Sequence, residues 1–130
     1  MARILIVDDE ESIRRLLQGV LTRAGHEVDS AADGNEALAA VRARTYDLVV
    51  TDLIMPGKEG IETIMELRTS QPAVKIIAMS GGSRVCALDY LTIASQLGAA
   101  ATLEKPFMID ALLGAVNAAV GGSATHRPPA

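Results

Sequence analysis

The chain has 130 residues, of which 49% are hydrophobic and 2% aromatic, and its net charge is −4. This length and an aliphatic composition predict one compact domain and leave no room for a second folded one. The acidic balance and the lack of a lysine or arginine cluster argue against nucleic-acid binding by this chain alone.

The sequence also argues against a membrane span and against disulfide bonds. No apolar run approaches the roughly 20 residues of a membrane span, and residues 1–3 lead into a strand rather than a signal peptide, so we expect a cytoplasmic location. Cys86 is the one cysteine, which excludes an internal disulfide and a cysteine-rich metal site.

The first part of the chain alternates strand and helix patterns. Residues 3–7 predict a buried strand that ends in Asp8-Asp9-Glu10, and residues 27–31 predict a more polar strand near a sheet edge. Apolar residues at helical spacing predict an amphipathic helix after the first strand and a second helix after the turn at residues 32–34. The predicted buried stripes are Ile13, Leu16, Leu17, Val20 and Leu21 in the first helix, and Ala37, Leu38 and Val41 in the second.

The rest of the chain continues the alternation. The apolar run at 48–50 predicts a strand that is buried on both faces and ends at Asp52, and Met55-Pro56-Gly57 stops it. Further strands are expected at 74–79 and 99–103, and a less distinct fourth helix between residues 83 and 98. The remaining predicted stripes are Ile61, Ile64 and Met65 in a third helix that begins near Glu59, and Ile109, Leu112, Leu113 and Val116 in the last helix.

Five strand–helix units predict an α/β fold with parallel strands, right-handed crossovers and helices on both faces of the sheet. In the doubly wound order 2-1-3-4-5, the first and third strands are neighbours about 4.8 Å apart. We expect the folded domain to span residues 1–120. The Gly-, Ser- and Pro-rich residues 121–130 are expected to form a flexible tail.

Polar residues follow four of these strands at one edge of the predicted sheet: Asp8 and Asp9, Asp52, Ser80 and Lys105. Each has an ordinary structural explanation, such as a helix N-terminal acid, a turn residue or a solvated charge. Their combination favours a phosphoryl-transfer site, because clustered carboxylates suit a hard cation such as Mg²⁺ and Asp52 can then attack phosphorus. Lys105 and Ser80 would contact the phosphoryl oxygens.

Taken together, Asp8-Asp9, Asp52 with Met55-Pro56, Ser80 and Lys105-Pro106-Phe107 resemble the receiver domain of two-component response regulators, over residues 3–120. The resemblance implies a flavodoxin-like (CheY-like) five-stranded fold. It also implies that Asp52 is a phosphoacceptor, not the nucleophile of a turnover enzyme, and that a histidine kinase or histidine phosphotransfer protein is the donor.

The resemblance further implies a ligand set and binding surfaces. Mg²⁺ would be held by Asp9, Asp52 and the main-chain carbonyl of Ile54, with Asp8 acting through water, and Lys105-Pro106 is a candidate cis bond. The kinase would bind near the first helix. A downstream protein would bind the fourth helix, fifth strand and fifth helix, and the chain is expected to be a monomer or a weak phosphorylation-dependent dimer.

Two departures from the family pattern concern the switch, and a further position concerns the lifetime of the acyl phosphate. Thr102 stands where receivers often carry a Tyr or Phe, so the switch either lacks an aromatic or uses another group such as Tyr90. The segment from Ser80 to Lys105 is slightly longer than usual and contains Gly81-Gly82, which favours mobility. The apolar Ile54 is expected to keep water from an acyl phosphate, although Gly82, which has no side chain, can offset that effect.

Alternative functions remain open at this level. The chain can be a single-domain regulator, the receiver part of a larger regulator with a DNA-binding or enzymatic output domain, or a pseudo-receiver scaffold that is not phosphorylated. A phosphohydrolase of the haloacid dehalogenase type is disfavoured because Ile54 stands where a second Asp is needed. A nucleotide-binding domain is disfavoured because no Gly-rich loop follows the first strand.

Overall fold

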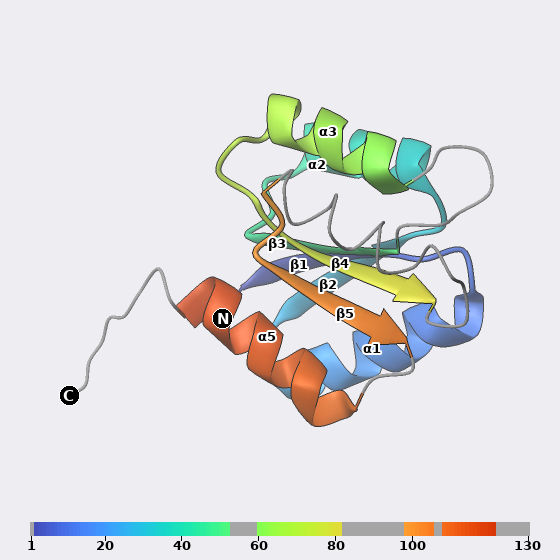
Figure 1. Ribbon diagram of the computed structural model, residues 1–130, viewed down its shortest axis with the longest axis vertical. Coiled ribbons are helices and arrows are strands. Elements are labelled where there is room, and N and C mark those ends of the chain that lie inside the picture. The colour runs from blue at the N-terminus through green and yellow to red at the C-terminus, as the bar shows by residue number, and fades with distance from the viewer. Residues whose placement is uncertain (1, 53–59, 82–97, 106–107, 122–130) are drawn as a thin grey trace.

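The computed structural model describes residues 2–52, 60–81, 98–105 and 108–121 (Figure 1). At residues 60–61, 80–81, 104–105 and 121 this description covers the backbone but not the side chains. Several predicted features lie wholly or mostly outside the described residues. These are the fourth helix, the Met55-Pro56-Gly57 segment, the Lys105-Pro106 bond and the tail at 122–130. Within the described ranges, no helix is long and apolar enough to cross a membrane.

A five-stranded parallel sheet forms the centre of the molecule, in the order β2-β1-β3-β4-β5. This order confirms the predicted doubly wound topology, including the edge position of the polar second strand. The strands are β1 (Arg3–Val7), β2 (Glu27–Ala31), β3 (Leu48–Asp52), β4 (Lys75–Gly81) and β5 (Ala101–Lys105).

Helices cover both faces of the sheet, with α2 and α3 on one side and α1 and α5 on the other (Figure 1). Each layer has its own apolar core, and Leu5 of β1 points into the first while its neighbours Ile4 and Ile6 point into the second. The helices are α1 (Glu11–Arg23), α2 (Gly34–Ala43), α3 (Gly60–Ser70) and α5 (Ile109–Gly121).

The turn predicted before α2 is closed by two reciprocal hydrogen bonds. The backbone N–H of Glu36 donates to the Asp33 carboxylate at 2.8 Å, and the Glu36 carboxylate accepts from the N–H of Ala32 at 2.7 Å. The bond to Asp33 satisfies a donor that the first turn of a helix leaves unpaired, and the bond to Glu36 ties this turn to the residue before the cap, which explains why the helix begins here.

Two residues that were predicted to be buried are exposed, and the last two strands begin and end later in the sequence than predicted. Leu16 is 50% exposed and Met65 is 53% exposed, whereas Leu17 and Ile64 beside them are buried. Successive residues of a helix are rotated by about 100°, so the neighbour of a buried residue can face the solvent. The strand expected at 74–79 runs from Lys75 to Gly81, and the one expected at 99–103 runs from Ala101 to Lys105.

Candidate functional site

Two acids follow the paired residues of neighbouring central strands. Val7 of β1 pairs with Thr51 of β3, so Asp8 and Asp52 leave this pair at the same level of the sheet. Asp8 is fully buried and Asp52 is 6% exposed. Because strands of a parallel sheet all end at one edge, acids that are far apart in sequence come together there.

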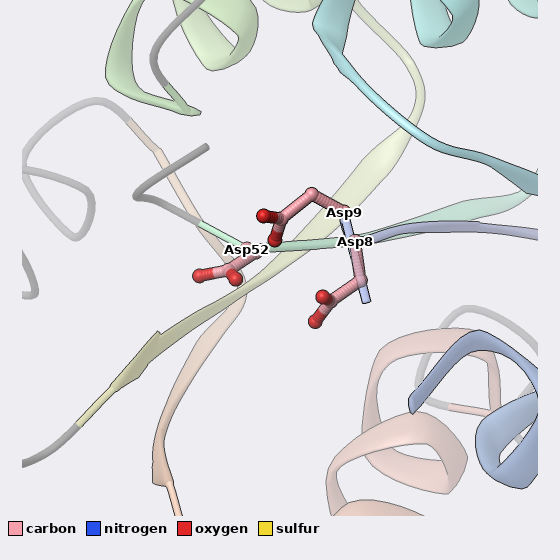
Figure 2. Close-up of side chains that lie close together, drawn as sticks. All are labelled: Asp8, Asp9 and Asp52. Carbon is pink, nitrogen blue, oxygen red and sulfur yellow. The ribbon is translucent and has the colours of Figure 1, made fainter. Parts of the chain in front are cut away.

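Asp9 completes a cluster of three carboxylates (Figure 2). One carboxylate oxygen from each of Asp8, Asp9 and Asp52 lies within 4.8 Å of the others. Asp9 is exposed, while the other two are buried, so the cluster opens to solvent on the side of Asp9. This is the grouping predicted from the strand ends.

The backbone around Asp8 is fixed by several hydrogen bonds. Its N–H donates to the carbonyl of Ala31 on β2 at 3.2 Å, and its carboxylate Oδ1 accepts from the N–H of Glu10 at 2.9 Å. The Arg14 guanidinium on α1 donates to the carbonyl of Asp8 at 2.7 Å. Arg14, which the sequence pattern did not mark as a site residue, is only partly exposed and contacts this loop.

Thr51 is a second residue that the sequence pattern did not single out. It is fully buried, and its hydroxyl donates to the carbonyl of Asp52 at 3.0 Å. A polar residue inside an otherwise apolar strand, directly before the acid, is the signal that could have drawn attention to it. This hydrogen bond holds the main-chain carbonyl of Asp52 in place.

The three carboxylates fit a hard divalent cation. Like charges this close raise the free energy of the ionised cluster, and burial of two of them removes the water that would otherwise screen the repulsion. Carboxylate oxygens are the ligands that Mg²⁺ prefers, and the exposed side leaves space for waters or phosphate oxygens to complete its shell. Mg²⁺ binding therefore suits the residues present.

Ser80 and Lys105 follow the same edge through the neighbouring strands. Asp52 pairs with Met79, which places the backbone of Ser80 one residue further along β4. Gly81 pairs in turn with Lys105 at the end of β5. The backbones thus carry both residues to the predicted edge, while their side chains and the Ile54 carbonyl lie outside the described part of the chain.

Thr102 stands where the family pattern often has an aromatic residue. It lies on β5 opposite Ala78 and is exposed. Tyr90, the residue predicted as an alternative aromatic group for the switch, lies outside the described residues.

Comparisons with known proteins agree with this geometry. The chain matches the response regulator receiver domain over residues 4–117. It is 36% identical to sporulation initiation phosphotransferase F of Bacillus subtilis over 115 residues, which cover 88% of this chain and 90% of that protein. It is also 36% identical to the transcriptional regulatory protein TcrA of Mycobacterium tuberculosis over 131 residues, covering 98% of this chain but 49% of TcrA.

Other relatives are considerably longer. The DNA-binding transcriptional regulator NtrC of Salmonella typhimurium is 33% identical over 126 residues, and these cover 97% of this chain and 26% of NtrC. The chain therefore spans about half of TcrA and about a quarter of NtrC, whereas it matches most of the sporulation phosphotransferase.

Solved structures show the same fold. A response regulator receiver domain protein from Clostridium thermocellum superimposes with a TM-score of 0.86 at 30% identity, covering 95% of this chain and 97% of that one. The response regulator TrrA of Thermotoga maritima, solved in complex with Mg(2+)-BeF, superimposes with a TM-score of 0.80 at 38% identity, covering 92% and 99%. The chain belongs to the family of response regulator receiver domains.

Proposed function

We propose that Asp52 accepts the phosphoryl group in this receiver domain, from a histidine kinase or a histidine phosphotransfer protein. The observation that carries the proposal is the position of Asp52, a buried carboxylate at the end of the central strand and within reach of two further acids. A carboxylate oxygen of Asp52 forms the new O–P bond as the P–N bond to the donor histidine breaks. The imidazole leaves with that electron pair and takes up a proton.

The metal ligands in this proposal are Asp9, Asp52 and the main-chain carbonyl of Ile54, with Asp8 acting through a bound water. When present, Mg²⁺ offsets the negative charge of the carboxylates and of the phosphoryl oxygens. Asp8 is held in place by its hydrogen bonds to Ala31 and Glu10, which supports its role in positioning the bound water.

Ser80 and Lys105 contact the oxygens of the phosphoryl group that Asp52 accepts. The Ser80 hydroxyl donates a hydrogen bond to one phosphoryl oxygen, and the Lys105 ammonium supplies a positive charge to another. Ser80 lies near the end of β4, which pairs with β3, and Lys105 lies at the end of β5, which pairs with β4; these positions support the two roles. An apolar Ile54 slows hydrolysis by keeping water from the acyl phosphate, which is tested by comparing the dephosphorylation rates of wild type and I54N; similar rates would contradict it.

Phosphorylation switches protein contacts in this proposal, and the chain does not act as a turnover enzyme. The kinase binds near α1, while a downstream protein binds the region of the fourth helix, β5 and α5. The chain itself works without nucleic acid or membrane, in the cytoplasm, as a monomer or weak phosphorylation-dependent dimer. The receiver domain spans residues 1–121 in this proposal, one residue further than predicted, because α5 ends at Gly121. The DNA-binding transcriptional regulator NtrC is longer, and this chain covers 26% of it, so we assign no DNA contact to this domain.

The test is a phosphorylation assay with a small donor. The chain is incubated with Mg²⁺ and acetyl phosphate or phosphoramidate, and the intact mass is measured under conditions that preserve acyl phosphate. Wild type should gain one phosphoryl group in a metal-dependent manner, and D52N should gain none. A wild type that gains nothing would favour the alternative of a pseudo-receiver scaffold.

A further inference from the structure

Arg14 connects the first helix to the acidic loop. It lies in the first turns of α1, where its own N–H donates to the carbonyl of Glu10 at 3.1 Å. Its guanidinium reaches back and donates to the carbonyl of Asp8 at 2.7 Å. A bond from a cationic donor at this distance is among the stronger hydrogen bonds that proteins form.

This bond acts on the peptide group between two of the clustered acids. The carbonyl of Asp8 and the N–H of Asp9 belong to one planar peptide unit, so an anchor on the carbonyl also sets the direction in which Asp9 leaves the loop. The N–H of Asp8 is tied to Ala31 on β2, and the Asp8 carboxylate is tied to the N–H of Glu10. Arg14 therefore restrains the part of the loop from which the exposed acid, Asp9, projects.

The helix gives Arg14 a rigid base. Leu17 and Leu21 of α1 are buried in the core beneath the sheet, which fixes the helix against β1 and its neighbours. Glu10, at the start of the helix, makes no side-chain capping bond. The link from Arg14 to Asp8 thus joins a packed helix directly to the loop.

We propose that Arg14 is a positioning residue, which sets the orientation of the Asp8–Asp9 peptide and thereby the Mg²⁺ affinity of the three carboxylates. This inference rests on the proposed function, because it assumes that the cluster binds Mg²⁺. Outer residues that orient metal ligands typically contribute about 10- to 100-fold to metal affinity.

Arg15 provides a matched control for charge. It lies on the same helix and carries the same charge, but its side chain is 79% exposed and pairs with Glu11 at 3.0 Å. Removing either arginine changes the net charge by the same amount. Only the removal of Arg14 releases the Asp8 carbonyl.

The experiment measures Mg²⁺ binding to the full chain by isothermal titration calorimetry at constant ionic strength, for wild type, R14A, R14K and R15A. We expect R14A to weaken binding about tenfold and R15A to change it less than twofold. R14K should recover part of the loss, because one ammonium N–H can still reach the carbonyl.

A second measurement is independent of metal. NMR of the metal-free proteins follows the carbonyl carbon shift of Asp8 and the amide shift of Asp9, which respond to loss of the hydrogen bond. Both shifts should move in R14A and stay in place in R15A. If R14A does not fold, as judged by circular dichroism, R14K is compared with R15A in the same two measurements, and the larger change is expected in R14K.

The outcomes separate this inference from the proposed function. Equal Mg²⁺ affinity in wild type and R14A, or equal weakening in R14A and R15A, would overturn the positioning role. A wild type that binds no Mg²⁺ would overturn the proposed metal site and with it the effect on affinity, while the NMR shifts would still report the link between Arg14 and the loop.

Discussion

Asp8 and Asp52 follow a paired position of adjacent parallel strands, and both carboxylates are buried within a cluster that also contains Asp9. Two buried negative charges at this separation repel each other, and a bound cation would offset that repulsion. Clustered, buried charges of this kind are typical of functional sites.

The first prediction concerns this repulsion. Without metal, we expect D8N to unfold at a higher urea concentration than wild type, with a gain of about 1 to 2 kcal/mol, because one of the clustered charges is removed. The asparagine oxygen can still accept the bond from Glu10, so the loop is preserved. The stabilisation that Mg²⁺ gives to wild type should be largely lost in D8N.

The control for this prediction is D33N. Asp33 caps α2 outside the cluster, and asparagine caps helices about as well as aspartate, so its stability should be nearly unchanged with or without Mg²⁺. If D8N is less stable than wild type in EDTA, the favourable interactions of the Asp8 carboxylate outweigh its repulsion by the other two acids, and the prediction is wrong.

The second prediction uses two adjacent leucines of α1. Leu17 is buried and Leu16 is 50% exposed. Leu17→Ala should lower the free energy of unfolding by about 2 to 5 kcal/mol, because it leaves a cavity against the sheet. Leu16→Ala should change it by less than about 0.5 kcal/mol. Urea denaturation measures both, and similar losses would place Leu16 in the core after all.

Sequence patterns predicted most of the fold because the sheet is built from unmistakable apolar runs. Residues 3–7 and 48–50 lack polar alternation, as expected for strands with helices on both faces, and the polar Glu27–Ala31 segment identified an edge strand. The small residues at 99–103 carry less information, and β5 begins two residues later than predicted. The prediction that Leu16 and Met65 are buried was wrong, because apolar residues also occupy exposed positions of helices.

The site was predictable as far as it depends on topology. Asp8, Asp9 and Asp52 come together because their strands end at one edge, which the strand order alone implies. The bonds from Arg14 to Asp8 and from Thr51 to Asp52 were not predictable, because each depends on a side-chain rotamer rather than on sequence spacing.

The third prediction concerns Tyr46, just before β3. Its hydroxyl donates to the Asp29 carboxylate on β2 at 2.6 Å, while Arg44 reaches the same carboxylate at 3.3 Å. Y46F should lower the free energy of unfolding by about 1 kcal/mol at neutral pH. R44A should have a smaller effect, because that ion pair is exposed on both sides.

Tyr46 also predicts a response to alkaline pH. Burial, together with the bond to Asp29, raises the pKa of Tyr46 to about 12 from its ordinary value of 10.0. The native state thus holds this proton more tightly than the unfolded state, so the contribution is complete below pH 10 and lost as the pH rises toward 12. The stability difference between wild type and Y46F should shrink over that range in urea titrations. A constant difference would contradict the raised pKa.

The fourth prediction concerns His26, directly before β2. The N–H of Ala2 donates to its Nδ1 at 3.2 Å, so this nitrogen must be unprotonated. Burial, followed by the positive charge of the N-terminus, lowers the pKa of His26 below its ordinary value of 6.5. The native state therefore takes up the proton less readily than the unfolded chain. The resulting stabilisation is complete above pH 6.5 and is lost as the pH falls through the lowered pKa.

NMR titration of the ring protons of His26 measures this directly. His26 should titrate below its ordinary value of 6.5. In urea unfolding between pH 7.5 and 5, H26Q should lose less stability than wild type, because glutamine can accept the Ala2 bond at every pH in that range. If His26 instead titrates at or above 6.5, its charged form must be stabilised by more than burial destabilises it, and the hydrogen bond from Ala2 cannot hold the ring in place.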